Sequence, residues 1–574
     1  MTFRQLPSLL LVLPALLTPA CGRGPGTFVA GQAGPEQAAD AVVYARVITM
    51  DPALPRAKGL AIRGGLIVEV STPEKLQRLV GPDTKIFNWR SRTVVPGLID
   101  AHVDLQALGE TMVGLDLKDA GGMDDIASRV RAVLAERGLG EYRWIVGHGW
   151  EEHRFRDGSV PDRRLLDAIA PNRPVLLYRA DRRSVLVNGE ALRLAGVDDQ
   201  TPDPPGGRLE HRPDGSLSGL VQGRAVGLVT RLIPPHPTDV LQALLKAALD
   251  RLAEAGYTSV QDLGGSSATW QALLALGEAG QLPIRVYTSV DSQDPELESL
   301  LSAGPQIGLF QHLLTLRTVR LDLDGELGGQ TASLLAPYTD APDRQGLEIA
   351  SRTALHELAT RLYKDGFQLA LHASGDGAVR ASLDALELLL PGWAHWDAVR
   401  PRLEGADVVA PDDASRFGLT HLIASVQPVR LARQMHWLGD RLGEERLEFV
   451  HPWRGLQQGG ATVVLGSGAP ELDFDPRAVF TAAVSRADES GWPAGGWKPM
   501  QRLPAADALA ALTLNAAHAA FEEQLKGSLQ PGKLADMTVL STDILYTDIE
   551  DLYRLRVLGT LVGGKLRYRT RHLR

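Results

Sequence analysis

Apolar and polar positions alternate in short runs at both ends of the chain. Residues 40–92 contain A-V-V-Y-A-R-V-I-T-M, G-L-A-I-R-G-G-L-I-V-E-V and T-K-I-F-N-W, and turns rich in Gly and Pro separate them. Residues 527–569 continue the pattern with L-A-D-M-T-V-L and V-L-G-T-L-V-G-G-K-L-R-Y-R. Alternation with a period of two predicts half-buried strands joined by hairpins. We therefore predict short strands at both ends of the chain.

The long middle of the chain alternates between helical and extended apolar patterns. The run L-Q-A-L-L-K-A-A-L-D-R-L-A-E-A-G-Y-T-S-V-Q-D predicts a helix, a glycine stop and then a strand that ends at Asp262. A similar run ends at His372, and G-L-Q-Q-G-G-A-T-V-V-L-G-S-G follows the same order. Such alternation predicts a parallel sheet with polar residues at the strand ends.

One predicted strand ends in a group of polar residues. Residues 94–105 read V-V-P-G-L-I-D-A-H-V-D-L, with an apolar, β-branched start that favours a strand. Asp100, His102 and Asp104 are two residues apart, so in a strand all three would face the same side. A β/α barrel gathers such strand ends at one mouth, where His and carboxylate groups can form a metal site.

The N-terminal residues resemble an export signal. In residues 1–20, Arg4 precedes an apolar stretch that is too short to span a bilayer. Cys21, the only cysteine, comes just after this stretch, as in bacterial lipoprotein signals, where the cysteine is lipidated. The alternative is an ordinary signal peptide with an incidental cysteine. Residues 21–38, rich in Gly, Pro, Ala and Gln, predict a flexible tether. We expect an exported protein of the cell envelope or periplasm, with a lipid on Cys21 as its membrane contact.

Length and composition narrow the classes further. A chain of 574 residues exceeds what one core needs, so at least two domains are expected. The net charge of −9 is mild, and no basic stripe indicates nucleic-acid binding. A single cysteine excludes an intrachain disulfide framework.

The quoted motifs resemble a known family. P-G-L-I-D-A-H at 96–102 resembles the first barrel strand of the amidohydrolase superfamily, in its YtcJ-like branch (amidohydrolase family 3), and G-S-L-Q-P-G-K-L-A-D at 527–536 resembles a family signature. The resemblance implies an α/β fold with a (β/α)8 TIM-like barrel at 94–525. It also implies a small β-sandwich domain built from 39–93 and 526–574, and an α/β insertion at 105–230. The implied activity is metal-dependent hydrolysis of non-peptide C–N bonds in small amides.

Several of the family's metal-binding positions hold other residues in this chain. His102 and His372 match family histidines. Asp104 stands where the family has a second histidine, and Gly468 stands where it has an aspartate that binds metal and moves protons. The positions that could still bind metal are His102, Asp104 and His372.

Three arginines stand at family positions for other site residues. Arg183 and Arg430 replace histidines, and Arg320 replaces a lysine. Guanidinium groups stay protonated, repel a divalent cation and attract anions. We therefore expect a pocket with little metal and no cofactor, which could take a small anionic ligand.

Other readings of the candidate residues remain open. His102 and His372 could simply be hydrogen-bonded residues at strand ends, and Asp104 could pair with an arginine. Asp322 and Asp324 lie two apart on one strand face, a spacing that suits a metal site, but D-G is also ordinary turn chemistry. Arg320 beside them favours a salt bridge over a metal, so we expect both aspartates to belong to the pocket.

Three functional hypotheses follow. The first is an amidohydrolase-family protein whose catalysis is impaired and which binds a ligand. The alternative is an active C–N hydrolase with a rebuilt mononuclear zinc site at His102, Asp104 and His372, with Glu404 or Glu471 transferring protons. A more distant third is a purely structural envelope protein.

Overall fold

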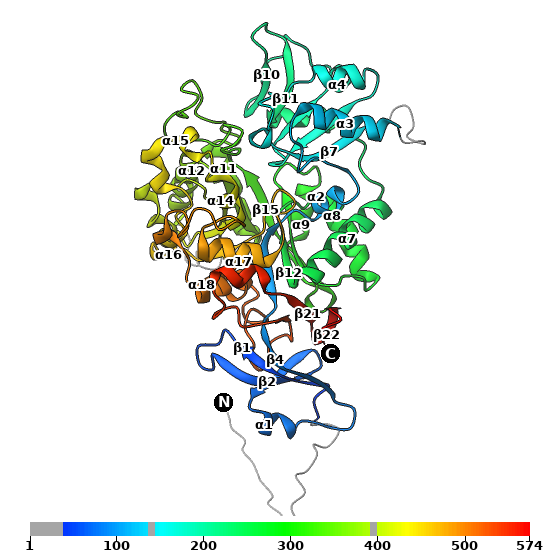
Figure 1. Ribbon diagram of the computed structural model, residues 1–574, viewed down its shortest axis with the longest axis vertical. Coiled ribbons are helices and arrows are strands. Elements are labelled where there is room, and N and C mark those ends of the chain that lie inside the picture. Colours follow the sequence, from blue (N-terminus) through cyan, green and yellow to red (C-terminus); the bar gives the residue numbers. More distant parts are fainter. Residues whose placement is uncertain (1–37, 136–143, 391–398, 574) are drawn as a thin grey trace, which may run out of the picture.

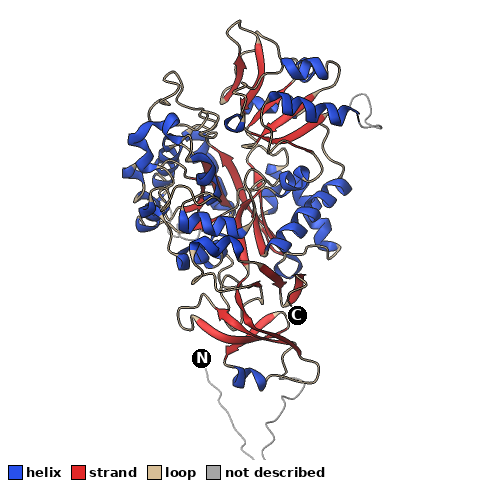
Figure 2. Ribbon diagram, in the orientation of Figure 1, coloured by secondary structure: helices blue, strands red, loops and turns tan. Residues whose placement is uncertain are grey.

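The structure is a computed structural model that describes residues 38–135, 144–390 and 399–573. Eight parallel strands form the barrel of the middle domain (Figures 1 and 2). In chain order they are β5 (Leu98–Val103), β12 (Tyr257–Asp262), β13 (Arg285–Asp291), β15 (Leu314–Asp322), β16 (Gln368–Ala373), β17 (Arg402–Gly405), β18 (Ile423–Val426) and β19 (Val463–Leu465).

The barrel closes where the first strand meets the segment after the last. Val103 and Ala469 form a parallel bridge, and the Gly468 amide donates to the carbonyl oxygen of His102 at 2.9 Å. The expected (β/α)8 TIM-like barrel is therefore confirmed. The His102 backbone thus lies at this closure.

Helices surround the barrel because each presents an apolar face to the strands. In α7 (Thr238–Ala255), for example, Leu245, Leu249 and Leu252 are fully buried. The other long helices between strands are α8 (Ser267–Glu278), α11 (Arg352–Asp365), α12 (Asp376–Glu387) and α17 (Pro476–Ser485). Shorter ones are α2 (Leu105–Thr111), α9 (Leu297–Ala303), α14 (Pro428–Gln434), α16 (Trp453–Gln458), α18 (Ala505–Ala511) and α19 (Leu514–Ala519).

Both chain ends join one seven-stranded sheet beside the barrel. Its order is β22-β21-β20-β4-β1-β2-β3, and the long strand β4 links the N-terminal strands to the C-terminal ones. Buried Val43 and Ile62 from one end share a core with Met537 and Leu561 from the other. The strands are β1 (Ala41–Ile48), β2 (Arg56–Arg63), β3 (Leu66–Ser71), β4 (Lys85–Pro96), β20 (Met537–Leu540), β21 (Val557–Val562) and β22 (Lys565–Arg569).

An α/β unit interrupts the chain between the first barrel strand and α7. Helix α2 still packs against α7, and the inserted sheet begins after it at β6 (Leu115–Asp116). The sheet order is β10-β11-β9-β8-β7-β6, and the unit lies at the end of the barrel opposite the terminal sheet (Figure 1). Its other elements are α3 (Met123–Ala135), β7 (Ile145–Trp150), α4 (Arg164–Ile169), β8 (Val175–Arg179), β9 (Ser184–Val187), α5 (Gly189–Ala195), β10 (Gly207–His211) and β11 (Leu217–Gly223).

The expected signal peptide, Cys21 and nearly all of the tether lie outside the described residues. Within the described ranges, no helix combines the length and apolarity that crossing a bilayer requires.

Candidate functional site at the barrel mouth

The imidazole of His102 is held by a carboxylate from across the barrel. Nδ1 of His102 lies 2.5 Å from Oε2 of Glu404, on β17. The other carboxylate oxygen of Glu404 accepts from the fully buried Arg402 at 2.5 Å. Burial alone would raise the pKa of Glu404, but Arg402 and His102 outweigh it and bring the pKa to about 2. The imidazole is therefore fixed through Nδ1, and its side chain keeps 18% exposure.

Asp104 is engaged in capping a helix. Its carboxylate accepts a hydrogen bond from the Ala107 amide at 2.8 Å, as an N-cap residue of α2 does. The polar residue that shares the barrel closure with His102 is instead Asp100, whose Oδ1 accepts from the Ser467 amide at 2.8 Å. Asp104, directly after β5, therefore caps the helix that follows it.

Glu326 lies beside His372, the second histidine that matches the family. Nε2 of His372 lies 3.3 Å from Oε1 of Glu326, and both side chains are nearly fully buried. Burial, together with the charge of Arg183, lowers the pKa of His372 to about 4. His372 is therefore a neutral imidazole near pH 7, packed against a carboxylate.

Two of the arginines identified from the sequence converge on the same carboxylate. Arg430 donates to Oε2 of Glu326, and Nη1 of Arg183 lies 3.2 Å from Oε1. Nη2 of Arg430 also donates to Glu471 at 3.0 Å. Burial alone would raise the pKa of Glu326, but Arg430, His372 and Arg183 hold it well below its usual range. We call Arg183, Glu326, His372, Arg430 and Glu471 the mouth cluster.

The third arginine pairs beside this cluster. Arg320 grips both oxygens of Asp322, at 2.8 and 2.9 Å, and Arg183 lies 3.4 Å from the same carboxylate. Asp324 is fully buried and accepts from the backbone amides of Ser333, Ser374 and Gly375. Asp322 therefore pairs with Arg320 and Arg183 beside the mouth cluster, whereas Asp324 anchors the loop backbone.

The backbone conformation and the surroundings of Gly468 disfavour any residue with a side chain. Its φ is +74°, and a Cβ there would lie 3.0 Å from Leu472 and 3.2 Å from Gln427. A side chain at this position would be strained in the present backbone.

A cavity of about 320 Å³ opens between the insertion and the barrel loops. Its size is at the lower end of the range for small-molecule sites. We call it the mouth cavity, and it is lined on the insertion side by Glu151, His153, Arg154, Arg179 and Asp181, and on the barrel side by Glu326, Gly328, Arg430, Ala432, Arg433, Gln434, His436, Trp437, Glu471 and Leu472.

The side chains at the mouth do not fit a zinc site. Zinc needs three protein ligands that converge on one open position. Here Nδ1 of His102 faces Glu404, and Nε2 of His372 faces Glu326. The buried Nδ1 of His372 makes no hydrogen bond to the described residues, and the Arg430 guanidinium donates to Glu326. Among the described residues, no group of three or more His, Cys, Asp or Glu side chains is arranged to hold a metal ion.

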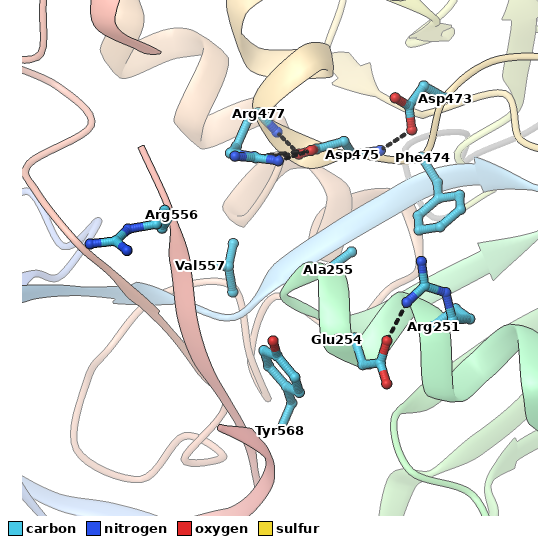
Figure 3. A pocket seen from close by; sticks show the side chains of 10 residues that line it. All are labelled: Arg251, Glu254, Ala255, Asp473, Phe474, Asp475, Arg477, Arg556, Val557 and Tyr568. Atoms are coloured by element: carbon cyan, nitrogen blue, oxygen red, sulfur yellow. Dashed lines mark hydrogen bonds and ion pairs between the residues drawn. The ribbon is translucent and has the colours of Figure 1, made fainter. Parts of the chain in front are cut away.

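A second hollow lies beside the terminal sheet (Figure 3). It measures about 400 Å³ and is open and charged. Two of its arginines are paired, Arg251 with Glu254 and Arg477 with Asp475, while Arg556 on its rim is exposed. This hollow has none of the buried polar groups that the barrel mouth gathers.

Sequence reasoning missed Glu326 although a signal for it was present. Asp322, Asp324 and Glu326 follow one another at intervals of two residues after a buried strand. Continuing that alternation by one step would have singled out Glu326. Glu151 and Arg433, by contrast, have no comparable pattern around them.

Comparison with known proteins now decides the family. A model described as "Amidohydrolase family" matches residues 86–568. The chain belongs to the amidohydrolase family. It is 34% identical over 540 residues to Protein LONG AFTER FAR-RED 3 of Arabidopsis thaliana, covering 92% of this chain and 91% of the relative.

Two further similarities agree with the YtcJ-like branch of the amidohydrolases. The chain is 29% identical over 523 residues to Putative amidohydrolase YtcJ of Bacillus subtilis, covering 89% of this chain and 96% of the relative. Its fold is similar to a crystal structure of an uncharacterized metal-dependent hydrolase from Pyrococcus horikoshii, with a TM-score of 0.71 and 26% identity. That match covers 89% of this chain and 99% of the other. Amidohydrolase ancestry and fold are thus established.

Proposed function

We propose that this amidohydrolase-family protein binds a small ligand at the barrel mouth and that metal-dependent C–N hydrolysis is impaired in it. The observation that carries the proposal is the position of Glu326 between Arg430, Arg183 and His372. A guanidinium paired with the buried carboxylate supplies the positive charge that a metal ion would supply elsewhere. A divalent cation would have to displace it and would meet repulsion from Arg183.

An anionic ligand is favoured by the arginines of the mouth cavity. Arg430 and Arg179 are buried, and Arg433 lies partly exposed on the barrel side. Guanidinium groups present planar donors that match carboxylates. Because carboxylates of the chain already neutralise most of these groups, the pocket suits a ligand with one anionic group.

One observation favours the alternative of an active hydrolase with a rebuilt metal site. Glu404 fixes His102 through Nδ1, which is how carboxylates orient metal-binding histidines. Zinc at this site would also need His372 and Asp104. Nε2 of His372 faces Glu326, while its buried Nδ1 makes no hydrogen bond to the described residues, and Oδ1 of Asp104 caps α2. The similarity to a metal-dependent hydrolase keeps this alternative testable.

Activity measurements separate the two functions. The full-length protein is assayed against a panel of N-substituted amides and esters, with chelator and with added zinc. We expect no turnover that depends on zinc, while thermal unfolding shifts upward with small carboxylates. Zinc-dependent turnover that is lost in the His102→Ala variant would overturn the proposal.

Export and lipid anchoring remain a proposal from residues 1–21. We infer a lipid on Cys21 as the membrane contact. Fractionation of cells that express the wild type or Cys21→Ser tests this inference. We expect the wild type in the membrane fraction and Cys21→Ser in the soluble fraction, and equal distribution would contradict it.

A further inference from the structure

Three of the four arginines that line the mouth cavity already pair with carboxylates. A ligand must compete for such groups, so they contribute little binding energy of their own. The pairs are Arg154 with Asp119 at 3.3 Å, Arg179 with Asp181 at 2.7 Å, and Arg430 with Glu326.

Arg433 differs from the other three. Its Nη1 donates to the backbone carbonyl oxygen of Glu471 at 2.9 Å. Among the residues that the structure describes, it makes no ion pair with a carboxylate. The backbone bond fixes the guanidinium at the cavity wall and leaves its charge for a ligand.

Glu151 provides an available charge of the opposite sign on the insertion side. Across the described ranges, its carboxylate makes no hydrogen bond or ion pair. Its negative charge acts to raise the pKa of Arg179 and of His153, which both line the cavity. The cavity therefore offers one cation on its barrel wall and one anion on its insertion wall.

Apolar surface completes the lining. Trp437 and Leu472 face the cavity, and the indole of Trp437 stacks on the His153 ring with centroids 4.7 Å apart. This stack joins the barrel side of the cavity to its insertion side. Apolar side chains between a few placed charges are the usual construction of a small-molecule site.

We propose that the mouth cavity binds a small zwitterion with an apolar body, whose carboxylate pairs with Arg433 and whose ammonium group faces Glu151. The inference rests on the proposed function in taking the barrel mouth as the ligand site. It adds the ligand class and the two residues that select it.

Calorimetric titration of the full-length protein tests the proposal with three probes that share one ring: 4-(aminomethyl)benzoate, benzoate and benzylamine. We expect the zwitterion to bind about tenfold more tightly than either singly charged probe, since each charge-assisted contact adds affinity. Arg433→Gln should weaken the two carboxylates about tenfold and leave benzylamine unaffected. Glu151→Gln should weaken the two amines.

Arg556→Gln is the matched control, because it removes an arginine that lines the other hollow and makes no ion pair with any described residue (Figure 3). It should bind all three probes as the wild type does. Equal affinity for the zwitterion and benzoate would overturn the proposal, as would equal binding by Arg433→Gln and the wild type, or no binding at all. Bound zinc in the wild type would instead overturn the proposed function and leave the selectivity by Arg433 and Glu151 standing.

Discussion

Nε2 of His372 lies 3.3 Å from Oε1 of Glu326, so a family histidine faces a carboxylate that two arginines also bind. In a zinc site, an imidazole nitrogen that faces the barrel mouth would be free for the metal. In the mouth cluster, the guanidinium groups of Arg430 and Arg183 instead balance the charge of Glu326.

Glu326→Gln should destabilise the protein by about 3 to 5 kcal/mol, because it leaves the buried Arg430 without a full counter-charge. Urea unfolding measures the change. Glu298→Gln is the control, since its pair with Arg361 is exposed and should contribute little. A Glu326→Gln protein as stable as the wild type would argue against the cluster.

Asp104→Ala should cost about 1 kcal/mol of stability through loss of the cap on α2. Asp104→Asn keeps an acceptor for the Ala107 amide and should retain most of that stability. Neither variant should change the metal content. A drop in bound metal in both variants would make Asp104 a ligand and refute the capping role.

The pH dependence of stability should reflect His148. Burial, together with the charge of Arg182, lowers the pKa of this residue to about 4. Because the unfolded chain takes up a proton near pH 6.5, the unfolded state binds more protons between pH 6.5 and 4, so stability falls as pH falls through that window. The loss amounts to about 3 kcal/mol at most.

Comparing wild type with His148→Gln isolates this contribution from those of other groups. The difference in unfolding free energy between the two proteins should change between pH 7 and 4, with the variant losing less. A constant difference over that range would show that His148 titrates normally.

Ligand affinity should also depend on pH, through Glu471. Burial raises the pKa of Glu471 to about 8 despite the nearby Arg430. Below that pH the neutral carboxyl does not repel an anion, so the affinity for benzoate should fall as pH rises through 8. The fall should be absent in Glu471→Gln. If the affinity for benzoate falls equally in both proteins between pH 7 and 9, Glu471 does not cause the pH dependence.

The fold was largely predictable because its signals are local. The helix, glycine and strand that end at Asp262 appear as α7, Gly256 and β12, and the alternating runs at both ends appear as one sheet. The P-G-L-I-D-A-H run likewise became the first barrel strand, β5.

The site was less predictable because its contacts are long-range. Glu326 and Arg430 are 104 residues apart in sequence, and no local pattern pairs them. The spacing of Asp104 suits a metal ligand at a strand end, yet its carboxylate caps the helix that starts directly after it. The mouth cavity depends on where the insertion docks, which neither periodicity nor motif spacing encodes.

Elemental analysis of the full-length protein, purified without chelator from cells supplied with zinc, tests the central claim most directly. The account predicts far less than one metal ion per chain, because the guanidinium groups of Arg430 and Arg183 occupy the charge positions around Glu326. About one zinc per chain, lost together with His102 or His372, would contradict it.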